Sequence, residues 1–322
     1  MRIVDIEKGF REVLGREPDP DAAAFYAQKS LTYTEFCDVL RKSREFKNKQ
    51  HVADPHLVGP VHNNKFTSWP FPQLFVATNI KVLYVPIAKN ACSSLKRLMV
   101  SLSDIPDKDR IATKGDIHTQ TDKHNTGIQL KDLPQVEAEN SLQSNIYFRF
   151  AVLRDPSSRL LSAYWEKFVI NRLDPDNLNH TLPVIEQIYR SKEQRGPDPD
   201  RGVTFGEFIH FILGSDPHDL DPHWCPQSEY VKNINITEFY NVTNLSPLYH
   251  KLERVSKKSI PDVKRNVTNS GRGLSVSGAS TMRPKELLQL GDIDLPSFYQ
   301  ESFYERVRHY YREDYRLFSL CN

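Results

Sequence analysis

The sequence has few cysteines, no long apolar run and no ATP-loop signature, and each absence excludes a class of protein. Cys37, Cys92, Cys225 and Cys321 are scattered and form no C-x-x-C pair, which argues against a disulfide scaffold and against a metal site such as zinc. No segment reaches the length of a membrane span, and the first ten residues contain no apolar signal-peptide core. The G-x-x-x-x-G-K-[ST] spacing is also missing, so no magnesium-bound triphosphate is expected.

Charge is nearly balanced, with 43 Lys+Arg against 41 Asp+Glu and a net charge of +2. This balance gives no general attraction to polyanions, and we expect no nucleic-acid partner. An acidic ligand must therefore be held by a local cluster. With 322 residues, 39% of them apolar, the chain can bury one large core plus a small accessory unit.

Residues 81–98, KVLYVPIAKNACSSLKRL, predict a strand, a tight loop and a helix N-terminus in succession. The apolar run ends at Pro86, Lys89 lies in the loop, and the helix begins near Ser93 and Ser94. Such a unit binds anions, because free backbone N–H groups and the helix dipole both point at the loop.

Residues 145–168, NIYFRFAVLRDPSSRLLSAYWEKF, predict a second strand that runs into a helix. Arg154 lies at the end of the strand, and Ser162 lies two turns into the helix. A guanidinium fork suits phosphate oxygens, and a hydroxyl supplies a further donor. We expect these two side chains to converge on one phosphate.

The two motifs together resemble the signature of the carbohydrate sulfotransferases, most closely the chondroitin 4-O-sulfotransferase type. The first, AKNACSSLKR at residues 88–97, is similar to the family loop for the 5′-phosphosulfate of PAPS (3′-phosphoadenosine 5′-phosphosulfate). The second, RDPSSRLLSAY at residues 154–164, is similar to the segment for the 3′-phosphate. A less specific match is the His-Trp pair in DPHWCPQSEY. The resemblance extends from about residue 81 to residue 320.

This resemblance implies a site for PAPS as co-substrate, with no metal. The candidate donor-binding residues are Lys89, Asn90, Ala91, Cys92, Ser93, Ser94, Arg154, Ser162 and Arg272. The last of these lies in a Gly/Ser-rich segment that either closes over the nucleotide, as in similar sulfotransferases, or is a surface loop. The chain departs from the family at Ala88, where Pro is usual, and at Leu95, where Trp is frequent. It also lacks the Cys-rich segment of many animal members, which bears on the acceptor more than on the donor.

Sulfuryl transfer needs a base on the acceptor hydroxyl and a cation at the leaving phosphate oxygen. Lys89 fits the second role, stabilising charge that grows in the transition state. A histidine suits the first role near neutral pH. In order of preference the candidates are His124, which lies thirty residues before Arg154, then His223, then His118 in the same predicted loop as His124.

Neighbouring side chains are expected to have structural roles. Arg159 and Tyr164 are predicted to brace the helix after the phosphate site rather than to contact substrate. Trp224 either lines the acceptor groove as a sugar-stacking ring or fills the core.

The predicted organisation is a small helical accessory domain at 1–50, a linker at 51–72 and a sulfotransferase domain at 73–322. The first resembles a helical unit found beside many bacterial glycan-modifying enzymes. The fold class is α/β, a P-loop-like three-layer fold with a central parallel sheet and ligands beyond the strand ends. Strands are predicted near 82–86, 146–153 and 236–240, and helices near 92–103, 156–171, 183–195, 204–213, 244–257 and 297–313.

The resulting hypothesis is a bacterial, cytoplasmic, PAPS-dependent carbohydrate sulfotransferase, free or peripheral to the inner membrane, that acts on a glycan or oligosaccharide acceptor. Loops around 104–145 and 172–230 are expected to determine the acceptor. Two alternatives stay open at this point: a nucleotide-dependent kinase, and a glycan-binding or scaffolding protein on an inactive sulfotransferase fold. The sequence does not indicate an oligomeric state.

Overall fold

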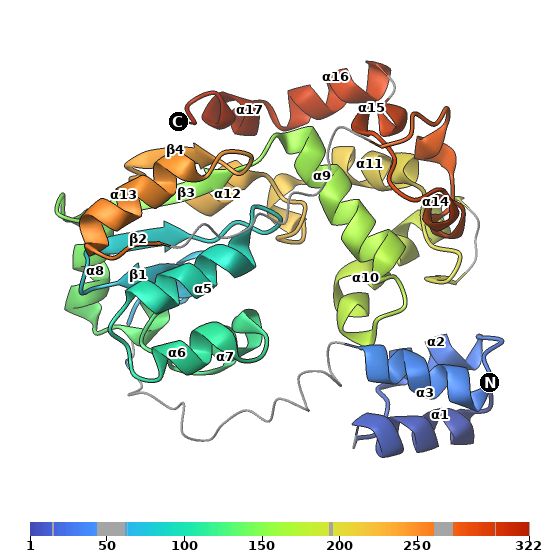
Figure 1. The fold of residues 1–322 in the computed structure, drawn as a ribbon. Helices are drawn as coiled ribbons and strands as arrows, with labels where there is room; N and C mark the ends of the chain where they lie inside the picture. The colour runs from blue at the N-terminus through green and yellow to red at the C-terminus, as the bar shows by residue number, and fades with distance from the viewer. Residues whose placement is uncertain are drawn as a thin grey trace. The chain divides into compact units, whose positions relative to one another are not determined.

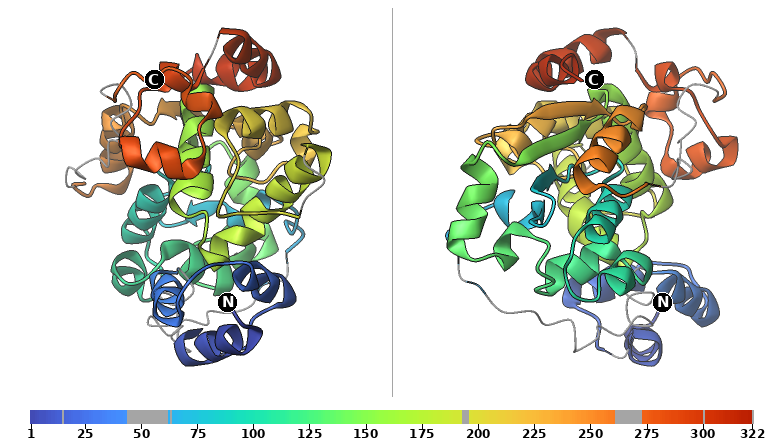
Figure 2. Two further views of the ribbon diagram at one scale, coloured as in Figure 1. Left: turned by 90° about the vertical axis from the view of Figure 1, so that its right-hand side faces the viewer. Right: turned by 60° about the vertical axis from the view of Figure 1, so that its left-hand side comes forward.

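The computed structural model describes residues 1–14, 16–43, 62, 64–192, 196–260, 273–299 and 301–321. By its internal contacts the chain divides into two compact units, each assembled from segments that are distant in sequence. We call them the helical unit (residues 1–53, 161–214 and 271–300) and the sheet unit (residues 54–160, 215–270 and 301–322). Figures 1 and 2 show the elements of both.

A four-stranded sheet forms the centre of the sheet unit (Figure 1). Its strands are adjacent in chain order: β1 (Phe75–Ala77), β2 (Val82–Val85), β3 (Phe148–Leu153) and β4 (Glu238–Asn241). Strands β2, β3 and β4 run parallel, which confirms the predicted α/β class and all three predicted strands. The difference is β1, a short edge strand that pairs antiparallel with β2 and was not predicted.

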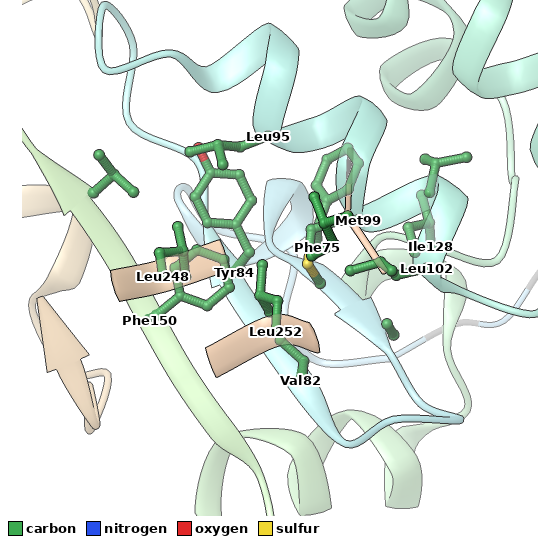
Figure 3. Packing of buried hydrophobic residues seen from close by; sticks show 14 of the residues in the cluster. Phe75, Val82, Tyr84, Leu95, Met99, Leu102, Ile128, Phe150, Leu248 and Leu252 are labelled. Atoms are coloured by element: carbon green, nitrogen blue, oxygen red, sulfur yellow. The ribbon is translucent and has the colours of Figure 1, made fainter. Parts of the chain in front are cut away.

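One face of the sheet is covered by α5 (Cys92–Leu102) and α13 (Ser246–Ser256), which follow β2 and β4. Figure 3 shows their leucines and Met99 packed against the aromatic rings of the strands. Tyr84 and Phe150 stack in this layer with ring centroids 4.9 Å apart. Because side chains alternate along a strand, every second strand residue enters this core.

The opposite face of the sheet carries a charged side chain, that of Arg149 of β3. Its guanidinium donates to the carbonyl oxygens of Asn235 (2.6 Å), Ser144 (2.8 Å) and Ser141 (3.3 Å). The last two lie at the end of α8 (Gln135–Gln143), which also contacts β2. Helix α17 (Arg312–Phe318) contacts β4. Because Arg149 joins the end of α8 to this face, helices accompany both faces, as a three-layer fold requires.

The outer edge of β1 is paired with a later piece of chain. The Val76 N–H donates to the Ile128 carbonyl (2.7 Å), and the Leu130 N–H donates to the Leu74 carbonyl (2.8 Å). Phe75 lies opposite Gln129 in an antiparallel bridge. The backbone groups at this edge of the sheet are therefore satisfied within the chain.

The helical unit begins with α1 (Ile3–Gly9), a π-helical turn (Phe10–Leu14), α2 (Pro20–Ala27) and α3 (Tyr33–Lys42). Phe10, Tyr26 and Phe36 pack together with ring centroids 4.8–6.0 Å apart. Leu178 of α10 (Pro175–Lys192) joins the same apolar cluster, and the Tyr26 hydroxyl donates to the Leu173 carbonyl (3.1 Å). The first helices thus share a core with a later segment. The division at residue 50 stays a prediction.

Most helix bounds lie close to the predicted ranges, with three differences. Helix α9 (Pro156–Tyr164) continues as a π-helix (Trp165–Ile170). Helix α10 begins well before the predicted residue 183. Pro183 lies inside this helix, although proline is favoured in the first turn of a helix. The predicted helix at 297–313 is divided into α15 (Leu295–Phe298), α16 (Glu301–Tyr310) and the start of α17.

The remaining helices are short. They are α6 (Lys108–Thr113), α7 (Ile117–Lys123), α11 (Phe205–Leu213), α12 (Gln227–Val231) and α14 (Pro284–Leu290), with 3₁₀ turns at Phe71–Gln73, Leu130–Asp132, Pro217–Asp219 and Ala279–Thr281. The predicted acceptor loops at 104–145 and 172–230 are therefore helical over much of their length. Among the helices described, none combines the length and apolar character needed to span a bilayer.

Candidate anion-binding site

The first motif forms a tight turn between β2 and α5. Lys89 and Ala91 both adopt left-handed backbone conformations, with φ of 72° and 58°. Ala91 is the N-cap of α5 and offers no side chain to its first turn. The first N–H groups of a helix have no partner inside the helix, and the helix dipole makes this end positive. An anion at the start of α5 can accept hydrogen bonds from these groups.

Asn90 fixes this turn from inside the protein. Its side chain is fully buried, and Nδ2 donates to the Val152 carbonyl (2.8 Å) and to Oε1 of Gln227 (2.6 Å). Gln227 also accepts from the Arg154 N–H (3.1 Å) and donates to the Arg154 carbonyl (2.9 Å). One glutamine thereby joins the turn after β2 to the end of β3. The assignment of Asn90 to the donor nucleotide stays a prediction.

Arg154 brings the second motif to the first. In the described structure its guanidinium makes one hydrogen bond, from NH1 to the Lys89 carbonyl (3.4 Å). Burial lowers the pKa of Arg154, while the neighbouring Asp155 acts against that shift. A largely desolvated cation with a single long hydrogen bond fits an anionic ligand. Ser162 belongs to the helical unit, and its convergence with Arg154 on one phosphate stays a prediction.

Arg159 has a structural role, as predicted, but it holds two turns rather than the helix after the phosphate site. Only 1% of the residue is exposed, and its guanidinium donates to the carbonyls of Ala88 (3.0 Å), Cys225 (2.7 Å) and Pro222 (3.1 Å). It therefore ties the residue before Lys89 to the turn that carries the His-Trp pair. Tyr164 is also structural, since its buried hydroxyl donates to the Val203 carbonyl (2.9 Å).

His118 contacts the start of α5 directly. It lies in α7 rather than in the predicted loop, and its Nε2 is 2.9 Å from Oγ of Ser93. Its Nδ1 is 3.1 Å from Nζ of Lys96, a residue that is 3% exposed. Arg97, the next residue, donates to the carbonyls of Ala112 (2.6 Å) and Gly115 (2.7 Å).

The other two candidate histidines, His223 and His124, differ in their hydrogen bonds. His223 is half-buried, and its Nδ1 and its backbone N–H lie 2.7 and 2.8 Å from Oδ1 of Asp221. His124 is the C-cap of α7 and, within the described chain, makes no hydrogen bond or ion pair. Trp224 is 1% exposed, which supports the core alternative over sugar stacking. Which histidine is the base stays a prediction.

Two functional supports were missed by sequence reasoning, Gln227 and Asp314. Asp314 of α17 is buried and accepts from the backbone N–H groups of Gln227 (2.7 Å) and Ser228 (2.8 Å), and burial raises its pKa. No sequence spacing connects these residues with the two motifs. The nearest signal was the polar Gln227 shortly after the His-Trp pair. Arg272, by contrast, lies outside the described residues.

Comparison with known proteins identifies the family of the chain. A family model described as "Sulfotransferase family" matches residues 72–320. The chain belongs to the sulfotransferase family. The matched range contains the turn at Lys89, the Arg154 segment and the His-Trp turn, so the braced loop of the sheet unit is part of the shared sulfotransferase sequence.

Several curated sulfotransferases are similar to the chain. Carbohydrate sulfotransferase 14 of Homo sapiens is 32% identical over 154 residues, which cover 48% of this chain and 38% of the relative. Carbohydrate sulfotransferase 9 of Homo sapiens is 26% identical over 171 residues, covering 52% and 36%. Carbohydrate sulfotransferase 10 of Rattus norvegicus is 24% identical over 214 residues, covering 64% and 53%. The chain thus spans between about a third and a half of these relatives. No solved structure matches it.

Proposed function

We propose that this chain transfers a sulfuryl group from PAPS to a hydroxyl of a glycan. The observation that carries the proposal is the hydrogen bond from the Arg154 guanidinium to the Lys89 carbonyl, because it joins the two motifs that the family resemblance assigns to the two ends of one nucleotide. The names of the curated relatives, all carbohydrate sulfotransferases, support a sugar acceptor.

Two features of the site suit the anionic groups of PAPS. The uncapped first turn of α5, with Lys89 before it, fits the 5′-phosphosulfate. The desolvated guanidinium of Arg154 fits the 3′-phosphate. We further propose that residues 90–94 complete the first contact through backbone and side-chain donors, that Ser162 is a second donor to the 3′-phosphate, and that Arg272 closes over the nucleotide. No metal is invoked, because the leaving group is already a stable phosphate.

The transfer step is an in-line displacement at sulfur. The acceptor oxygen bonds to sulfur while the bond from sulfur to the 5′-phosphate oxygen breaks, and the electron pair leaves with the phosphate. The Lys89 ammonium stabilises the charge that grows on that oxygen. The hydroxyl proton moves to a histidine base.

We assign the base to His223, ahead of His124. The Asp221 carboxylate accepts the proton of His223 Nδ1, so Nε2 is the ring nitrogen that takes the proton of the acceptor. Arg159 also ties the turn of His223 to the residue before Lys89. His124 has no comparable orienting contact in the described chain.

Transfer of labelled sulfate from PAPS to polysaccharide tests the proposal. Lys89→Ala is expected to lower turnover at least 100-fold without changing the circular-dichroism spectrum, since it removes a transition-state contact worth about 3 kcal/mol. Arg154→Ala is expected to weaken binding of PAP, the desulfated nucleotide, about ten-fold or more by calorimetry. The matched control is Arg316→Ala, an exposed arginine paired with Glu313.

The outcomes separate the proposal from its alternatives. Unchanged turnover in Lys89→Ala would contradict the role of Lys89. Binding of magnesium-ATP in place of PAP would indicate a nucleotide-dependent kinase. Glycan binding with no affinity for PAP would indicate a binding protein on an inactive fold. A larger loss of turnover in His124→Ala than in His223→Ala would reverse the assignment of the base.

A further inference from the structure

We propose that Lys96, His118 and Ser93 form a hydrogen-bonded relay that turns the Ser93 hydroxyl into an obligatory donor to the anion at the start of α5. The relay connects two helices of the sheet unit, since Lys96 and Ser93 lie on α5 and His118 lies on α7. This inference rests on the proposed function, because it concerns the same donor site. It assigns a positioning role to two side chains that do not themselves contact the ligand.

The burial of Lys96 is the first step of the argument. Helix lysines usually extend into water, yet this residue is 3% exposed. Its Nζ lies 3.7 Å from Oδ1 of Asp122 and 5.2 Å from the centre of the Phe75 ring. The carboxylate and the ring face both favour a positive charge at this place. The closest polar contact of the ammonium is Nδ1 of His118 at 3.1 Å.

The chemistry of these groups sets the direction of the hydrogen bonds. An ammonium group has three donors and no acceptor, so Nδ1 of His118 must be the acceptor. The proton of the neutral ring is then on Nε2, which lies 2.9 Å from Oγ of Ser93 and 4.0 Å from Sγ of Cys92. Nε2–H donates to Ser93, the nearer of the two.

The consequence for Ser93 follows from the capacity of a hydroxyl group. Ser93 has one proton, and because Oγ accepts from His118, that proton is directed elsewhere. Ser93 is exposed in the first turn of α5, where the donor phosphate is proposed to bind. The opposite arrangement, with the hydroxyl donating to His118, would present oxygen lone pairs to an anion. The buried ammonium excludes that arrangement, and its charge strengthens the chain of hydrogen bonds.

Calorimetry with two nucleotides tests the relay. PAP carries both phosphates, whereas adenosine 3′-monophosphate lacks the 5′-phosphate. Ser93→Ala, His118→Ala and Lys96→Met are each expected to weaken PAP binding about ten-fold, the effect of losing one hydrogen bond to a charged group. The same three variants should leave the affinity for adenosine 3′-monophosphate within about two-fold.

Two further variants distinguish a relay from a packing effect. His118→Gln keeps one acceptor and one donor on the side chain, and it is expected to restore PAP affinity to within about two-fold of the wild type. The double variant Ser93→Ala/His118→Ala should bind PAP about as weakly as either single variant, because both remove the same contact. Lys123→Met, which removes the charge of an exposed lysine on α7, is the matched control for Lys96→Met.

The results that would overturn the relay differ from those that would overturn the proposed function. A wild-type protein with no affinity for PAP contradicts the proposed function. Wild-type affinity for PAP with no change in His118→Ala contradicts the relay alone. A double variant weakened about 100-fold, or an equal loss for the two nucleotides, also contradicts it. Thermal melting of each variant shows whether it is folded. If His118→Ala does not fold, the PAP affinity of His118→Gln tests the relay in its place.

Discussion

Arg159 holds a full positive charge inside the sheet unit and balances it with backbone carbonyls. Moving an unpaired charge out of water costs several kcal/mol, and three carbonyl oxygens at 2.7–3.1 Å offset that cost. Each of these oxygens belongs to a turn around the proposed donor site. The position of the loop before Lys89 is therefore set by the core and does not depend on a bound ligand, which is the arrangement that electrostatic catalysis requires.

Cys225 provides a prediction about pH. Burial raises the pKa of its thiol from 9.0 to about 12. Above pH 9 the unfolded thiol loses its proton while the folded thiol keeps it, so this residue stabilises the fold below pH 9 and loses that effect as pH rises toward 12. The free energy of unfolding should fall by up to about 1.4 kcal/mol per pH unit more steeply in the wild type than in Cys225→Ala, measured by urea unfolding.

Alkylation is an independent test of whether the Cys225 thiol is buried and protonated. Iodoacetamide reacts with thiolates, so Cys225 should stay unlabelled in the native protein at about pH 8.5 and should be labelled in urea. The unfolded sample is the control for the chemistry itself. Rapid labelling of Cys225 in the native protein would contradict the buried, protonated state.

Sequence reasoning identified the residues with distinctive chemistry and missed those with structural partners. Lys89, Arg154 and Arg159 stood out because a charged side chain at a strand end or within a motif usually faces a ligand or a buried polar partner. The sequence around Gln227 shows no such pattern. Its role depends on hydrogen bonds with the Asn90 side chain and the Arg154 carbonyl, which lie in two distant segments. The sequence predicts a loop around His118, and its contact with Ser93 appears only in the folded structure, where His118 lies on α7.

At the scale of elements, Gln227 joins the turn before α5 to the end of β3. Gln227→Met keeps the length of the side chain but removes both hydrogen-bonding groups. Asn90 Nδ2 then loses one of its two hydrogen bonds, and the backbone N–H and carbonyl of Arg154 each lose their hydrogen bond to Gln227. We expect a loss of about 2–4 kcal/mol in the free energy of unfolding and weaker binding of PAP.

Urea unfolding and PAP calorimetry measure the two effects of Gln227→Met. Gln143→Met, on an exposed position of α8, is the matched control and should change stability by no more than about 0.5 kcal/mol. Equal stability of the two variants would show that the Gln227 contacts do not hold the site together.

Elements were predictable where local pattern and tertiary structure agree. Strand β2 is a continuous apolar run and β3 is interrupted only by Arg149, a pattern typical of strands buried on both faces, and both lie where expected. Strand β1 has three residues and is defined by its pairing with β2, which no local pattern reveals. Helix α10 is longer than predicted, and Pro183 lies inside it although proline is more common at a helix start than in a helix interior.

At the scale of the whole molecule, the first three helices share their core with α10. Removing residues 1–43 would expose Leu178 and take away the partner of the Leu173 carbonyl. We expect the truncated protein to melt at a lower temperature and to be cleaved within α10 by a protease that leaves the full chain intact. An α10 that stays protected would instead support the predicted division into an accessory domain and a catalytic domain.

A point variant tests the same core without shortening the chain. Phe36→Ala removes a fully buried ring from the aromatic cluster and is expected to cost about 3–5 kcal/mol of stability. Val4→Ala, at an exposed position of α1, is its control and should be nearly neutral. Equal melting temperatures for the two variants would contradict a shared core.

The pairing of β1 with residues 128–130 has a consequence for how copies of this chain behave in concentrated solution. An uncovered strand invites a second molecule to add its own strand, and such additions start aggregates. Here the exposed side of β1 is already occupied by the chain's own backbone. Self-association through this border of the sheet would first require residues 128–130 to detach, so the border resists fibre-like growth while the fold is intact.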